Sequence, residues 1–218
     1  MKTLDVNNLV NSLEKVKVIN SPFKRSIKWF GISFVLMTLL TFVLYCFKEC
    51  SMNTYPLSFY FESLALVLVS YLSIFAAFLY SSPDETYQRY AKTLSITSIA
   101  IWTSLFAYCI YHCLTQGHAG HILHELSNAV INITEIFNIL FIGLLPTLWL
   151  ILMLKKAFPT NKRITGLLVI LGSLTLAMVF SRFLSENIEA SHMLVWKYSP
   201  LLILSIISFL LGNKLLSK

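Results

Sequence analysis

Charged residues are scarce in this chain. Asp, Glu, Lys and Arg make up 12% of its 218 residues, whereas soluble proteins average about a quarter. Hydrophobic residues account for 56%, and the mean hydropathy is +0.72. So few charges cannot keep a chain of this length in water. We therefore expect an integral membrane protein whose connecting loops are too short to hold a separate soluble domain.

Signatures of catalysis are also missing. The sequence has no HExxH zinc motif, no phosphate-binding P-loop, no GxSxG nucleophile motif and no acidic pair on one predicted helix. We expect a protein that is not an enzyme. No small-x-small cleavage site follows the first apolar run, so we also expect no cleavable signal peptide.

Six apolar runs are present. Crossing the hydrocarbon layer of about 30 Å takes about 20 apolar residues in a helix. The sequence therefore predicts an all-α integral membrane protein, a bundle of six transmembrane helices between residues 27 and 213, with residues 214–218 as a C-terminal tail. The predicted spans are 27–47, 57–81, 90–114, 130–154, 164–184 and 193–213.

The net charge of the chain is +7, and the basic residues are distributed unevenly between the two sides of the predicted bundle. With the N-terminus in the cytoplasm, 14 of the 17 Lys and Arg residues fall on the inner side, leaving Lys48, Arg182 and Lys197 outside. This is the positive-inside distribution. It predicts a multi-pass membrane protein with both termini cytoplasmic. The charge then orients the protein in the lipid bilayer, and no direct nucleic-acid partner is needed to explain it.

Residues 1–26 are the only sizeable water-compatible stretch. Apolar residues recur there at steps of three and four, the spacing of one helical face, and Pro22 separates this helix from the first span. The short amphipathic cytoplasmic helix has two possible roles: it lies on lipid headgroups, or it docks into a groove of a soluble partner. Its apolar face consists of Val6, Leu9, Val10, Leu13 and Val16.

Four ionisable residues fall within the outer halves of four different spans. They are Glu62, Glu135, Arg182 and Lys197. Burying such groups in a membrane is costly, which makes them candidates for a functional site. Two arrangements remain open: the two acids and two bases compensate one another, or each side chain reaches separately to the interface.

Cysteine and histidine also gather on the predicted outer side. Cys46 and Cys50, like Cys109 and Cys113, are four residues apart and share a helical face. Nearby histidines would allow a zinc or copper sensing site, and a disulfide is a second possibility. The alternative is apolar filler and solvated imidazoles, so no cofactor is predicted outright. The candidate metal or redox residues are Cys109, Cys113, His112, His118, His121 and His124.

Several short motifs follow one another in a characteristic order. Leu145-Pro146 precedes the basic turn Lys155-Lys156 and Pro159, and the last span starts with Met193-Leu194-Val195-Trp196 followed by Pro200. With the acid in the second span, this order resembles the NrsF family of bacterial membrane anti-sigma factors. The chain departs from the family in lacking a cysteine at 183–187 and in carrying Lys197 where histidine is common.

The resemblance implies a partner and a mechanism. The tail, through Leu9, Val10 and Leu13, would bind an extracytoplasmic-function sigma factor and keep it from RNA polymerase. An envelope signal would then release the sigma factor in a stress response. A different function fits the same composition: a small-solute or proton-coupled transporter or permease component, with Glu62 lining the path. A metal-handling membrane protein is a third option, and the oligomeric state is left open.

Overall fold

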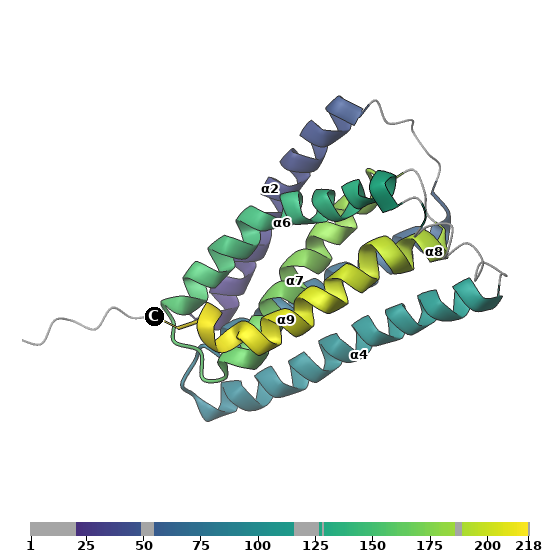
Figure 1. Ribbon diagram of the computed structural model, residues 1–218. Helices are drawn as coiled ribbons and strands as arrows, with labels where there is room; N and C mark the ends of the chain where they lie inside the picture. Colours follow the sequence, from purple (N-terminus) through teal and green to yellow (C-terminus); the bar gives the residue numbers. More distant parts are fainter. Residues whose placement is uncertain (1–20, 49–54, 116–126, 128, 186–188, 218) are drawn as a thin grey trace, which may run out of the picture.

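Six long helices form a bundle in the computed structural model, which describes residues 21–48, 55–115, 127, 129–185 and 189–217 (Figure 1). All six are long and apolar enough to cross a membrane, so the predicted all-α bundle of six long apolar helices is confirmed. The last span is composite, because a π-helical turn interrupts it. The elements are α2 (Pro22–Lys48), α3 (Leu57–Leu79), α4 (Glu85–Thr115), α6 (Ala129–Lys155), α7 (Lys162–Arg182), α8 (Ala190–Met193), η1 (Leu194–Tyr198) and α9 (Ser199–Leu215).

Helices α2 and α4 each begin five residues before the predicted apolar spans 27–47 and 90–114. Pro22 is the first residue of α2, where a missing N–H costs nothing because the first turn has no intrahelical acceptor. α4 begins at Glu85, and the Asp84 carboxylate accepts a 2.8 Å hydrogen bond from the Thr86 N–H. The predicted amphipathic helix of the tail lies outside the described residues.

Helix α7 is the centre of the bundle, packed against α3, α6 and α9. Its glycines permit this closeness, because small residues let membrane helices approach one another. A Cβ built on Gly166 would lie 2.9 Å from the backbone oxygen of Ser208 in α9. The Ser208 hydroxyl donates to the Gly166 carbonyl at 2.7 Å. On the other side, a Cβ on Gly172 would meet Ile74 of α3 at 2.7 Å.

Helix α2 lies at the edge of the bundle and is held near its beginning. The Trp29 indole donates a 3.2 Å hydrogen bond to the carbonyl of Pro146, the proline inside α6. α6 changes direction along its length (Figure 1), as expected of a helix with an interior proline. The Arg25 guanidinium donates to the Met153 carbonyl at 3.4 Å and lies 4.9 Å from the ring centroid of Phe78. The segment that follows the tail is thus tied to α6 and α3.

The start of α2 and the C-terminal end of α9 lie at the same end of the bundle (Figure 1). The turn from α3 to α4 and the turn from α6 to α7 lie there too. The two turns are joined, because the Thr160 N–H and hydroxyl both donate to the Tyr80 carbonyl, at 2.9 and 3.1 Å. We call the opposite end the distal end.

Candidate functional site

The distal end holds an ion pair between α7 and α3. Arg182 in the last turn of α7 donates from Nη2 to Oε2 of Glu62 at 2.7 Å. The guanidinium also stacks on the Phe59 ring, 4.5 Å from its centroid, a favourable cation–π position. The Arg182 side chain is 4% exposed and that of Glu62 is 29% exposed. Among the described residues, Nε and Nη1 of Arg182 find no hydrogen-bond partner, so this buried cation depends largely on one carboxylate.

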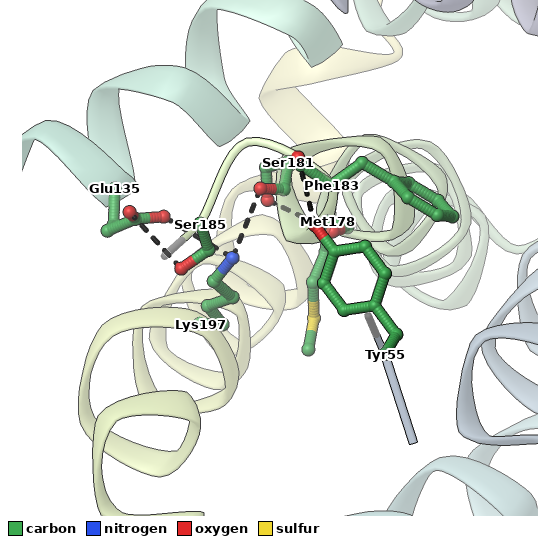
Figure 2. Close-up of polar contacts among 7 residues, drawn as sticks. All are labelled: Tyr55, Glu135, Met178, Ser181, Phe183, Ser185 and Lys197. Atoms are coloured by element: carbon green, nitrogen blue, oxygen red, sulfur yellow. Dashed lines mark hydrogen bonds and ion pairs between the residues drawn. The ribbon is translucent and has the colours of Figure 1, made fainter. Parts of the chain in front are cut away.

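A second ion pair joins the last span to α6. Lys197 is fully buried, and its Nζ lies 3.3 Å from Oε2 of Glu135, whose side chain is 8% exposed. The same ammonium donates to the Ser181 carbonyl at 3.3 Å, and the Ser185 hydroxyl donates to Oε1 of Glu135 at 3.3 Å. Figure 2 shows these contacts converging from different segments. Oε2 accepts no directed hydrogen bond within the described chain, so the attraction between Lys197 and Glu135 is mainly charge on charge.

The π-helical turn that carries Lys197 has a local cause. Pro200 has no N–H, so the Trp196 carbonyl loses the donor it would have in an α-helix. The Ser199 hydroxyl donates to the Leu194 carbonyl at 2.7 Å, five residues back. π-helical turns of this kind are frequent at functional sites.

The end of α7 connects the two pairs, because Ser181 and Arg182 are neighbours in the chain. Ser181 donates from its own hydroxyl to the Met178 carbonyl at 3.0 Å, and the Tyr55 hydroxyl donates to the Phe183 carbonyl at 3.3 Å (Figure 2). All four ionisable residues singled out from the sequence therefore meet in this region. The geometry favours mutual compensation over separate snorkelling. Their functional role remains a prediction.

Sequence reasoning missed the uncharged members of the network. Ser185, Ser181 and Phe59 were not singled out, because serine and phenylalanine are ordinary within membrane spans and in the turns beside them. One signal was available: Ser185 follows Arg182 by three residues, so both fall on one side of a helical turn. Nothing in the sequence pointed to the Ser181 carbonyl, since every residue carries one.

A cavity of about 180 Å³ lies beside the Glu62 carboxylate. Parts of α3, α4 and the last span line it. The residues on its walls include Ser58, Glu62, Leu105, Tyr108, Met193 and Tyr198.

The predicted metal or redox residues are only partly within the described chain. Cys109 and His112 line the cavity, and the Cys109 thiol donates to the Ala190 carbonyl at 3.3 Å. Cys109 and Cys113 are buried and carry no disulfide. Within the described ranges, no three Cys, His, Asp or Glu side chains are grouped to hold a metal ion. His118, His121 and His124 lie outside those ranges, so a zinc or copper site stays a prediction.

The fold and the polar network define a polytopic helical membrane protein built around one central helix. The chain matches the model of the NrsF family, described as negative regulator of sigma F, over residues 9–217, and it belongs to that family. No curated protein and no solved structure matches it. The family is one of anti-sigma regulators, regulatory rather than catalytic, which favours this class over the transporter considered from composition.

Proposed function

We propose that this protein is a membrane-embedded anti-sigma factor. It holds an extracytoplasmic-function sigma factor at the cytoplasmic face of the inner membrane and releases it on an envelope signal. The observation that carries the proposal is the family match over residues 9–217, which covers most of the tail, residues 9–26, as well as the whole bundle. A regulator of a cytoplasmic transcription subunit needs a cytoplasmic binding segment, and the positive-inside charge distribution supports a cytoplasmic tail.

The sigma factor binds the apolar face of the tail. Leu9, Val10 and Leu13 form the centre of that face, with Val6 and Val16 at its ends. A helix of about a dozen residues is marginally stable alone in water, so the tail gains its helix on binding, as an amphipathic helix in a groove. The affinity of the tail for the sigma factor then depends on whether the tail is free to form this helix.

Release requires the bundle to act on α2, which continues from the tail. The contacts of Arg25 and Trp29 with α6 connect α2 to the helix that also carries Glu135. Moving a two-state equilibrium from 1:99 to 99:1 takes about 5.5 kcal/mol. Removing one partner of a buried ion pair costs about 3–5 kcal/mol. Disturbing the two ion pairs at the distal end would therefore change the free energy by nearly the amount needed to change the occupancy of the sigma factor.

Deleting residues 2–17 tests the proposal. We expect constitutive transcription from the promoters of the released sigma factor, with membrane insertion unchanged because all six spans remain. A sharper version replaces Leu9 and Leu13 with Asp, and its matched control places the same number of charges on the other helical face as Asn8→Asp and Asn11→Asp. The first double variant should release the sigma factor and the second should not. An unchanged transcriptome after the deletion would contradict the proposal.

A further inference from the structure

The cavity beside Glu62 has the dimensions of a specific small-molecule site. A cavity of about 150 Å³ in another protein binds benzene, so about 180 Å³ admits one six-membered ring with a small substituent. Lipids and peptides are too large for it. The walls suit a ring compound, because the apolar side chains of Leu105 and Met193 and the aromatic side chains of Tyr108 and Tyr198 all line the cavity.

The charges around the cavity select an uncharged ligand. Arg182 already balances the Glu62 carboxylate at 2.7 Å, so a cation would leave surplus positive charge in largely buried surroundings. An anion would face the carboxylate itself. The second carboxylate oxygen, Oε1, accepts no hydrogen bond from any group in the described chain, and it can take one from a hydroxyl.

A metal ion fits the cavity less well than a hydroxyl compound. The sulfur of Cys109 is occupied as a donor to the Ala190 carbonyl, whereas a metal needs the thiolate. The remaining side chains do not compose a three-ligand group within the described ranges.

We propose that this cavity binds a small uncharged aromatic alcohol, a molecule the size of phenol, whose hydroxyl donates to Oε1 of Glu62. The bound hydroxyl draws electron density from the carboxylate and weakens its hold on Arg182. Arg182 is buried, and two of its nitrogens have no partner among the described residues, so it shifts with its carboxylate. The end of α7 then moves against Lys197 through Ser181. This regulatory consequence rests on the proposed function, whereas the binding itself does not.

Fluorine NMR on the full chain in lipid nanodiscs tests the binding, with 4-fluorophenol as the probe and empty nanodiscs as the background for partitioning. We expect saturable binding of 4-fluorophenol. Fluorobenzene, compared at equal free concentration, should bind at least about tenfold more weakly, because it cannot donate to the charged acceptor. 4-Fluorobenzylamine, the cationic probe, should bind more weakly as well.

Filling the cavity provides the matched variants. Leu105→Trp and Ser58→Trp place a large ring in the space or at its edge and should lower the 4-fluorophenol affinity at least tenfold. Ser58 is exposed at the start of α3, so that variant tests the site even where the substitution at Leu105 disturbs packing. Ala107→Trp adds the same ring at an exposed position of α4 that is not among the lining residues, and the affinity should be unchanged.

Three results would overturn the site: no saturable binding, equal binding of fluorobenzene, or Zn²⁺ binding there that depends on Cys109 and His112. The regulatory consequence is tested with a transcriptional reporter for the sigma factor, which phenol should activate in the wild type but not in Ser58→Trp. Binding without a reporter response would overturn that consequence alone. The deletion of residues 2–17 reports independently on the proposed function, so the two failures can be told apart.

Discussion

Lys197 shows why a single side chain matters in this bundle. Its ammonium is fully buried between Glu135 and the Ser181 carbonyl, so replacing it leaves a carboxylate with no cation in a dry interior. We predict that Lys197→Met lowers the free energy of unfolding by about 3–5 kcal/mol. Thermal unfolding of the purified protein in detergent measures the loss.

Two further variants decide the cause of that loss. Lys214→Met removes a lysine from an exposed position near the end of α9 and should leave stability within about 0.5 kcal/mol of the wild type. The double variant Glu135→Gln with Lys197→Met removes both charges and should recover much of the loss. If the double variant were as unstable as Lys197→Met alone, lost packing rather than the unpaired carboxylate would be responsible.

At the scale of the helix, the contact between α7 and α9 depends on the absence of a side chain at Gly166. A Cβ there would lie 2.9 Å from the Ser208 carbonyl oxygen and 3.0 Å from the Gly212 Cα. Both are backbone atoms, which cannot rotate away as a side chain can. We predict that Gly166→Ala destabilises the protein by about 1–3 kcal/mol, visible as a lower thermal midpoint.

Gly31 is the matched control. It also lies inside a helix, but a Cβ there would meet nothing within 4 Å. Gly31→Ala should therefore be neutral or stabilising by up to about 1 kcal/mol, the difference in helix propensity. Equal destabilisation by both substitutions would mean that these positions need glycine for the backbone conformation of their own helix, and not for the close packing of α7 against α9.

At the scale of the whole molecule, an even number of spans would put both chain ends on one side, and the positive-inside rule predicts that this side is the cytoplasm. We predict that alkaline phosphatase is inactive when fused after Lys218 and active when fused after Thr115, since the enzyme folds only in an oxidising compartment. The opposite pattern would place the tail outside the cell, where no sigma factor could reach it.

The predictability of the fold differs from that of the site. The six spans could be predicted, because a membrane imposes one length and one polarity on every helix that crosses it. The helices α2 and α4 extend beyond the apolar runs, because Pro22 and Asp84 favour a helix start outside the apolar stretch that defines a span. Glu62 and Lys197 could be singled out as ionisable residues within spans, yet their partners were left open.

The amino-acid sequence by itself determined that this chain enters the membrane, how many times it crosses and which residues are costly to bury there. It also determined the family, through short motifs spread along the chain. Only the tertiary structure decided that Arg182 pairs with Glu62 and Lys197 with Glu135, because each partner comes from a distant helix and no local periodicity relates the two. The same packing around α7 created the cavity, whose walls come from three separate parts of the chain.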